Sequence, residues 1–394
     1  MQDYSGVALT CPVSFGYTKQ SAHGANWFIG STLKRVLDAA GLKKADIDGI
    51  AVSSFSLGAD SAITVTQHLQ ITPRWIENAP YGGASGVMAM RRAARAIQCG
   101  DAEIVACIGG DGAAHRSFEY TAANFSNFTI DASFPYGAGG PNTAFSMITR
   151  NYMEQYGATR EDFARISLDQ RYNANHYAPA LLGHKQLTLE QYLNARPIVG
   201  PLHLFDCVMP CAGGEGFLMM SEDRARHLGL DWCRILAADE LHNAHPQDLV
   251  QYRGGWTEYA GDLYTMAALG PNDIDMLQTY DDYPVISMLQ MEDLGFCAKG
   301  DAAAFVQHTD MRFDHSGSQR NKLAHNTSGG QLSVGQAGAA AGYLGVVESI
   351  RQLTDQAVSN QVENANNSMV CGFGMINYER GLCTAAAILG RPSA

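Results

Sequence analysis

Apolar and polar residues follow one another along this chain in blocks that predict alternating helices and buried strands. Residues 6–11 predict a short strand, and apolar residues at helical spacing predict an amphipathic helix over residues 26–40. Later blocks predict a helix over residues 87–98 and strands at residues 104–110 and 216–220. Because helices that alternate with buried strands usually cover both faces of a sheet, the pattern predicts an α/β fold.

Three segments of the first half recur downstream in the same order. The pairs are 40–48 with 267–275, 82–86 with 339–342, and 103–110 with 368–374. They predict two homologous halves, residues 1–230 and 231–394, with the break near residues 222–240. A stretch in the first half, about residues 113–205, has no counterpart in the second half and predicts a cap or loop insertion.

Composition excludes several classes of protein. The chain has 394 residues, of which 46% are hydrophobic and 17% charged, so a large core is expected and disorder is not. The net charge of -12 argues against a nucleic-acid partner, and no apolar run is long enough to span a membrane. With no signal-like start, we expect a cytoplasmic protein. Its nine cysteines are expected to be reduced thiols, and no metal site is expected.

The most distinctive stretch is the glycine-rich segment 323–353. Its glycines allow a tight turn, and the small residues 339–342 let a buried helix start against its neighbours. Unpaired N–H groups at such a helix start can hold an anionic oxygen, and Tyr343 would lie in the first turns of the helix.

The phrase Asn326-Thr-Ser-Gly-Gly-Gln-Leu-Ser-Val-Gly335 resembles the Asn-x-x-Gly-Gly…Gly-His-Pro loop of the thiolase superfamily, in its sterol-carrier-protein-x branch. This resemblance covers nearly the whole chain. It implies a thiolase fold with a mixed sheet in each half, layered α-β-α-β-α, an acyl-CoA substrate and a homodimer formed through the sheet of the first half. The family's catalytic His aligns with Gln336, so this chain departs from the pattern at a position that matters for catalysis.

The thiolase cysteines are also replaced. The nucleophilic Cys aligns with Gly83, in the phrase Gly83-Ala-Ser-Gly86, and Ser85 is a conceivable substitute. The second Cys aligns with Val370, which leaves Cys371 one residue out of register and facing the other way on a strand. On this alignment the usual route of Claisen condensation is lost.

Tyrosines and carboxylates near these positions resemble the steroid side-chain aldolases of the same superfamily. The family turn after the second half's strand maps onto Tyr280-Asp281-Asp282-Tyr283. We therefore expect retro-aldol cleavage of a 3-hydroxyacyl-CoA into a ketone or aldehyde and a shorter acyl-CoA, with Tyr280 and Tyr343 moving protons and Asp281 orienting them. The remaining candidates are His325 and Tyr283 as further proton-transfer groups, and Gly83, Ser85, Asn326, Gly330, Gln336 and Gly374 around the thioester oxygen.

Two alternatives remain open at this stage. One is a thiolase or acyltransferase that uses Cys371 or Ser85, and the other is an acyl-CoA-binding subunit without activity. The aldolase resemblance implies a separate small partner with an OB-like DUF35 domain, in a heterotetramer. It implies no cofactor beyond the coenzyme A of the substrate. The acyl group is left open among steroid, bile-acid and aromatic side chains.

Overall fold

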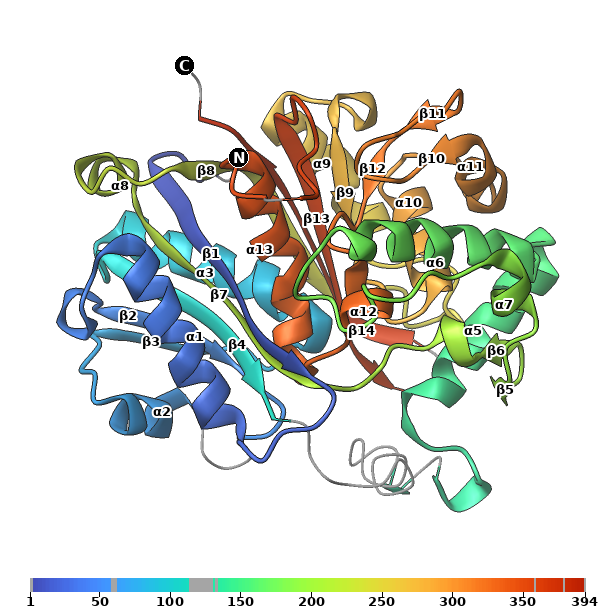
Figure 1. Cartoon of the computed structure of the whole chain (residues 1–394), viewed down its shortest axis with the longest axis horizontal. Helices are drawn as coiled ribbons and strands as arrows, with labels where there is room; N and C mark the ends of the chain where they lie inside the picture. The colour runs from blue at the N-terminus through green and yellow to red at the C-terminus, as the bar shows by residue number, and fades with distance from the viewer. Residues whose placement is uncertain are drawn as a thin grey trace.

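A large sheet is the frame of this protein. The computed structural model describes residues 3–57, 62–112, 130–131, 134–357, 359–377 and 380–392. Ten strands form one sheet, whose strands are labelled in Figure 1. In spatial order they are β12 (Ala324–His325), β9 (Met276–Gln278), β13 (Asn367–Asn377), β14 (Arg380–Gly390), β8 (Trp232–His242), β1 (Val7–Thr18), β7 (Ala212–Ser221), β4 (Ile104–Asp111), β2 (Gly49–Ser53) and β3 (Trp75–Asn78).

The strand order is symmetric about the junction of β1 and β8. In the first half β2 pairs in parallel with β3 and β4, whereas β7 is antiparallel to β4 and β1. In the second half β9 pairs in parallel with β12 and β13, whereas β14 is antiparallel to β13 and β8. The α/β fold of two similar halves is therefore present. One detail differs from the expectation, because a short antiparallel contact between β1 and β8 joins the two mixed sheets into one.

Helices form three layers around the strands. Helices α1 (Ala25–Ala40) and α2 (Ala62–Leu69) pack on the outer face of the first half. On the outer face of the second half lie α9 (Trp256–Ala267) and α10 (Pro284–Asp293). Helices α3 (Ser85–Cys99) and α13 (Ala341–Leu353) form the middle layer, in a core shared with strands of both halves. This is the expected α-β-α-β-α arrangement.

Glycine makes the middle layer possible. A Cβ atom on Gly86 would lie 2.2 Å from the carbonyl oxygen of Gly342, so the starts of α3 and α13 touch backbone to backbone. The glycine-rich segments on which the sequence analysis centred therefore meet at one point of the fold.

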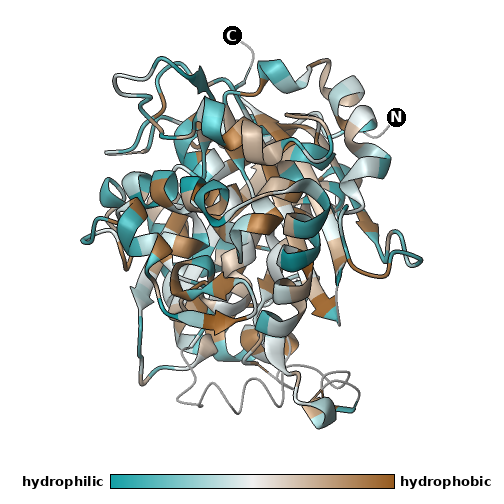
Figure 2. Cartoon of the chain, turned by 90° about the vertical axis from the view of Figure 1, so that its right-hand side faces the viewer, coloured by the Kyte–Doolittle hydropathy of each residue, from teal (hydrophilic) through white to brown (hydrophobic). Residues whose placement is uncertain are grey.

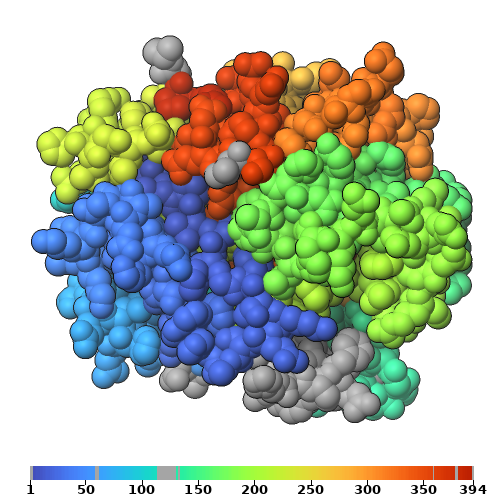
Figure 3. All heavy atoms as spheres, in the orientation of Figure 1, coloured from blue at the N-terminus to red at the C-terminus, as the bar shows by residue number. Residues whose placement is uncertain are grey.

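The insertion is the main difference between the two halves. In the second half only residues 378–379 separate β13 from β14, whereas residues 112–211 separate β4 from β7. The described part of this insertion contains η4 (Phe134–Tyr136), α5 (Gly140–Tyr156), α6 (Arg160–Asn175), α7 (Leu189–Leu193), β5 (Pro197–Val199), β6 (Leu202–His203) and η5 (Leu204–Asp206). It packs on the second half and forms a separate green lobe in Figure 3. Residues 113–129 and 132–133 of the expected cap lie outside the described ranges.

Short elements complete the chain: η1 (Lys44–Asp46), η2 (Gly82–Ala84), α8 (Glu222–His227), η6 (Pro271–Asp273), α11 (Ala302–His308), β10 (Thr309–Asp310), β11 (Asn321–Lys322), α12 (Gly330–Val334) and η7 (Gly338–Ala340). Figure 2 shows apolar residues gathered in the inner elements and hydrophilic residues on the outer helices and loops. Within the described ranges no helix has the length and apolar character needed to cross a membrane.

Candidate active site

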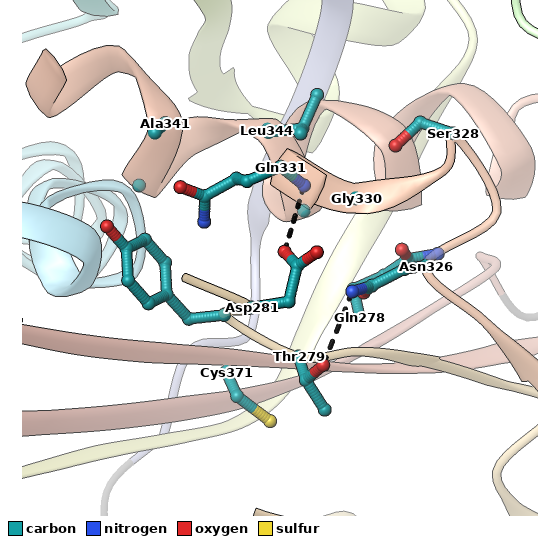
Figure 4. Close-up of a pocket in the computed structure, with 13 residues that line it drawn as sticks. Gln278, Thr279, Asp281, Asn326, Ser328, Gly330, Gln331, Ala341, Leu344 and Cys371 are labelled. Carbon is teal, nitrogen blue, oxygen red and sulfur yellow. Dashed lines mark hydrogen bonds between the residues drawn. The ribbon is translucent and has the colours of Figure 1, made fainter. Parts of the chain in front are cut away.

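The turn that follows β9 is fastened to the glycine-rich loop by a carboxylate. Asp281 accepts hydrogen bonds from the backbone N–H groups of Gln331 at 3.0 Å and Leu332 at 3.2 Å, in the first turn of α12. Figure 4 shows the first of these bonds. Gly330 has a φ of +59°, and a Cβ atom there would lie 2.2 Å from the Asp281 carboxylate. Burial raises the pKa of Asp281 to about 7, although the two N–H groups favour the charged form.

Tyr280, Asp282 and Gln336 form a hydrogen-bonded group beside this turn. The side-chain amide nitrogen of Gln336 donates to Asp282 at 2.7 Å and to the hydroxyl of Tyr280 at 3.2 Å. Burial raises the pKa of Asp282 to about 8, although hydrogen bonds from Tyr280 and Gln336 oppose the rise. Burial and the neighbouring Asp282 raise the pKa of Tyr280 well above its ordinary value. Tyr280 is therefore a proton donor at neutral pH, and Asp282 can gain or lose a proton there.

The end of the insertion holds Gln336 in place. The backbone N–H of Gln336 donates to the carbonyl of Met209 at 2.9 Å, and its carbonyl accepts from the N–H of Cys211 at 3.0 Å. The insertion thus fixes the residue that stands in the position of the thiolase His.

Gly83, the counterpart of the thiolase nucleophile, has no room for a side chain. A Cβ atom on Gly83 would lie 2.0 Å from Cε2 of the Tyr280 ring and 2.3 Å from the carbonyl oxygen of Phe373. A Cβ atom on Gly374 would lie 3.2 Å from the nitrogen of Gly83. The backbones of Gly83 and Gly374 therefore lie together beside the Tyr280 ring, and no nucleophile can occupy position 83.

Neither substitute nucleophile is activated. Ser85 is fully buried, and its hydroxyl oxygen accepts a hydrogen bond from the N–H of Tyr81 at 3.0 Å. Burial raises the pKa of Cys371 far above that of an ordinary thiol. Figure 4 shows its sulfur pointing away from Asp281 and Gln331. Among the described residues, neither side chain has a general base within hydrogen-bonding distance.

His325 differs from the expectation of an acid or base. Its Nε2 atom lies 2.7 Å from the hydroxyl of Thr279, the side chain is fully buried, and burial lowers its pKa to about 3. The imidazole is therefore neutral at neutral pH, and its hydrogen bond with Thr279 holds the end of the strand in place. Asn326 lines the cavity of Figure 4 and donates to the same hydroxyl at 3.3 Å, with a φ of +42°.

The structure does not assemble the expected pair of Tyr280 and Tyr343. The Tyr343 hydroxyl lies 2.9 Å from that of Ser53, and its ring packs near Phe217 in the core that both halves share. Gly342 and Leu344 line the cavity, whereas Tyr343 is turned toward the strands because successive residues of a helix face different sides. No hydrogen bond or ring contact joins Tyr343 to Tyr280 in the part of the chain that the structure describes.

Tyr283 belongs to the core between the halves and the insertion. Its ring stacks on Phe145 with 4.0 Å between centroids, and its hydroxyl donates to Asn142. Both partners belong to α5, so Tyr283 anchors the insertion and does not face Tyr280. The expectation of a catalytic Tyr283 is not supported by this geometry.

Asp282 and Gln331 are the site residues that the sequence analysis did not select. Asp282 directly follows Tyr280 and Asp281, which were selected. Side chains of a turn do not alternate regularly as they do in a strand, so the sequence does not tell which of them faces the site. Gln331 was read only as part of the glycine-rich phrase. In the described ranges no group of three or more His, Cys, Asp and Glu side chains is placed to hold a metal ion.

Comparison with known proteins finds matches along most of the chain. The family model "Thiolase, N-terminal domain" matches residues 14–180, and "Thiolase C-terminal domain-like" matches residues 237–391. The "Steroid side-chain-cleaving aldolase" of Thermomonospora curvata is 30% identical over 356 residues, which are 85% of this chain and 87% of that protein. The "17-hydroxy-3-oxo-4-pregnene-20-carboxyl-CoA lyase" of Mycobacterium tuberculosis is 29% identical over 96% of this chain and 98% of that protein.

Solved structures show the same fold. A structure titled "Ltp2-ChsH2(DUF35) aldolase" matches with a TM-score of 0.80 and 26% identity over 98% of both chains. Human mitochondrial 3-ketoacyl-CoA thiolase matches with a TM-score of 0.68 and 14% identity over 99% of this chain and 100% of that chain. At that identity the human enzyme shows the fold alone. Family models over both halves and a 30% identical relative along most of the length show that this chain belongs to the thiolase superfamily.

Proposed function

We propose that this protein is an acyl-CoA aldolase, a carbon–carbon lyase that cleaves a 3-hydroxyacyl-CoA into a ketone or aldehyde and a shorter acyl-CoA. The observation that carries the proposal is the replacement of the thiolase nucleophile by the ring of Tyr280, whose hydroxyl shares the amide of Gln336 with Asp282. The similarity to a steroid side-chain-cleaving aldolase and a pregnene-carboxyl-CoA lyase supports the same reaction class.

The proposed reaction needs one proton acceptor and one oxyanion site. Ionised Asp282 takes a proton from the substrate's 3-hydroxyl through Tyr280, whose hydroxyl gives up one proton and gains another. The oxygen electrons form the new carbonyl, the Cα–Cβ bond breaks, and its electron pair becomes a thioester enolate. The same pair then returns the proton to Cα, so the enzyme ends in its starting state. The reaction uses no cofactor beyond the coenzyme A of the substrate.

The enolate oxygen requires hydrogen-bond donors that are in place before the reaction. We assign this role to the backbone N–H groups of Gly83 and Gly374, which lie close together in space. A Cβ atom on either residue would clash with its neighbours, so only glycine fits there. Gln336 keeps its amide on Tyr280 and Asp282, and Asp281 fastens the turn that carries Tyr280. The steroid names of the relatives make a steroid side chain the first substrate to try.

Two assembly partners belong to this proposal. The matching aldolase structure carries DUF35 in its title, and a separate DUF35 protein is proposed as the partner of this chain. A homodimer is proposed through β3, the edge strand of the first half, whose outer residue Ile76 is 36% exposed. Cross-linking and light scattering of the chain with and without the partner measure both assemblies.

Mass spectrometry tests the reaction. The purified chain and its DUF35 partner are incubated with a 3-hydroxyacyl-CoA that carries a tertiary alcohol and, separately, with acetyl-CoA. Release of a ketone and a shorter acyl-CoA with unchanged protein mass supports the aldolase. An acylated peptide that contains Cys371 or Ser85 shows an acyltransferase instead, and binding without turnover shows a non-catalytic subunit.

A further inference from the structure

A narrow polar cavity lies against Tyr280 on the side of Asp281. The space between its atoms, including space that is open to solvent, is about 270 Å³, but the centre of a water molecule has only about 10 Å³ in which to move. About this much room accommodates one water molecule and no acyl group. Its polar side chains come from the end of β9 and the turn after it, and from the loop before α12 and the first turn of that helix (Figure 4). They are Gln278, Thr279, Tyr280, Asp281, Asn326, Ser328 and Gln331.

Several polar atoms that line this cavity have no partner. The side-chain oxygen of Gln331 is buried and forms no hydrogen bond, although the residue is only 2% exposed. The amide oxygens of Gln278 and Asn326 and the hydroxyl of Ser328 form no hydrogen bond with any described residue either. A buried polar atom that remains unpaired is costly, so the oxygen of Gln331, beside three further side chains with unused hydrogen-bonding capacity, indicates a polar occupant.

The surrounding hydrogen bonds fix which atom of Gln278 faces the cavity. The hydroxyl of Thr327 donates to Glu348 at 2.7 Å, so it can only accept from Gln278, whose amide nitrogen lies 2.9 Å away. The carbonyl oxygen of Gln278 is left for the cavity. An occupant must therefore donate hydrogen bonds to amide oxygens, and it can accept from Ser328 or from the amide nitrogen of Gln331.

From these contacts we infer that the cavity binds one buried water molecule, hydrogen-bonded to Gln331 and to at least two of Gln278, Asn326 and Ser328. Water meets the requirement for two donated and two accepted hydrogen bonds. A metal cation fits less well, because the one carboxylate that lines the cavity, Asp281, accepts two N–H groups of α12.

This water links two segments that build the site. Residue 278 precedes the turn that carries Tyr280 and Asp282, and residues 326–331 precede Gln336. The bound water is therefore a positioning group for Tyr280 and Gln336, a role that rests on the proposed aldolase function. The presence of the water itself does not depend on that function.

A high-resolution crystal structure of the full chain tests the water directly. The expected result is one ordered peak at about 2.7–3.2 Å from the Gln331 amide and from at least two of the other three side chains. An empty cavity would overturn the inference. So would a Gln331 side chain bonded directly to Asn326 or Ser328, or a peak at the shorter distances of a bound cation.

Two variants separate the role of the water from general damage. Gln331→Met keeps the length of the side chain but removes both polar atoms, whereas Gln307→Met makes the same change at an exposed residue of α11. Gln331→Met is expected to lose the water peak, lower the thermal midpoint by a few degrees and lower kcat about tenfold with little change in KM. Gln307→Met is expected to resemble the wild type. Equal effects of the two variants would contradict the positioning role, and a wild type without aldolase activity would overturn the proposed function while the crystal structure still tests the water.

Discussion

The ring of Tyr280 occupies the space that a side chain on Gly83 would need. A Cβ atom on Gly83 would lie 2.0 Å from Cε2 and 2.1 Å from Cζ of that ring, and no pair of carbon atoms approaches so closely without a covalent bond. Gly83 comes from η2, just before the first half's middle helix α3, and Tyr280 from the turn after a strand of the second half. A side chain of the second half therefore occupies the place in the first half where a thiolase holds its nucleophile.

A side chain on Gly83 is expected to be costly. Gly83→Ala should lower the free energy of unfolding by about 3 kcal/mol or more, because overpacking forces Tyr280 and the backbone at Phe373 apart. Adding Tyr280→Ala should restore part of this loss and not all of it, since Phe373 still lies 2.3 Å from the new Cβ. Chemical denaturation of the single and double variants measures the coupling, and strictly additive effects would show that the two residues do not compete for space.

Tyr280→Phe removes the hydroxyl that bonds to Gln336. We expect kcat to fall by about 10²-fold or more, because the proton of the substrate then has no path to Asp282. Tyr264→Phe is the matched control, since it also removes a buried hydroxyl, bonded at 2.8 Å to the carbonyl of Leu294, but on an outer helix. Steady-state kinetics on both variants decide the matter, and equal losses would argue against a proton-transfer role for Tyr280.

Asp282 predicts a particular dependence of rate on pH. Its pKa is raised from 3.8 to about 8, mainly by burial, and only the ionised form accepts a proton, so kcat/KM should rise as the pH rises through about 8. Asp282→Asn should lower the plateau and remove this rise. A profile of the variant that still rises near pH 8 would assign the titration to another group.

The same raised pKa changes stability in the opposite direction. The folded protein holds the proton of Asp282 more tightly than the unfolded chain does, so this contribution to stability is present at low pH and is lost as the pH rises from about 4 to about 8. Asp281 and Glu215, with pKa values raised by burial to about 7 and about 8, act in the same sense. The free energy of unfolding of the wild type and of Asp282→Asn is therefore measured against pH. The difference between the two curves gives the contribution of Asp282.

Cysteine labelling tests the absence of a thiol nucleophile. Cys99 is exposed and should react with a small alkylating reagent in the native protein, whereas buried Cys371 should react only after unfolding. Peptide mapping after exposure to an acyl-CoA should find Cys371 unmodified. An acyl group on Cys371 would mean that the strand places this thiol in the reaction path.

Tyr343→Phe should act on stability and not on the proton-transfer group. Loss of its hydrogen bond with Ser53 is expected to lower the free energy of unfolding by about 1 kcal/mol, and Ser53→Ala should have a similar effect. The double variant should lose little more than either single variant, because the bond is already broken. A fall in kcat as large as that expected for Tyr280→Phe would contradict the position assigned to Tyr343.

The fold was predictable from the sequence because its signals are repeated. Buried strands, helix starts rich in glycine and three segments in matching order indicated the layered two-half arrangement. The join of β1 with β8 was not predictable, because edge strands carry no sequence signal that specifies their partner. The pairing of Pro210 with Gln336 likewise depends on residues far apart in the chain.

The site was predictable only in part. The turn 280–283 and the loop 326–336 meet as expected, because both follow strands that are neighbours in the sheet. Which side chains face the cavity was not predictable. Gly342 and Leu344 line it and Tyr343 does not, because successive residues point in different directions around the axis of α13. The full burial of His325, which lowers its pKa to about 3, was not predictable, because it depends on packing that the sequence does not display.

The symmetric sheet has a consequence for the number of reaction centres. Ser53 lies five residues after Asp48, and Tyr280 lies five residues after Asp275, so the two occupy matching corners of the repeated scaffold. At the first corner Ser53 is tied to Tyr343 inside the core, and at the second Tyr280 faces Gln336 beneath the insertion. The two halves thus contain two equivalent corners. Under the proposed function only the corner with Tyr280 is a reaction centre, so a homodimer would contain two centres and not four.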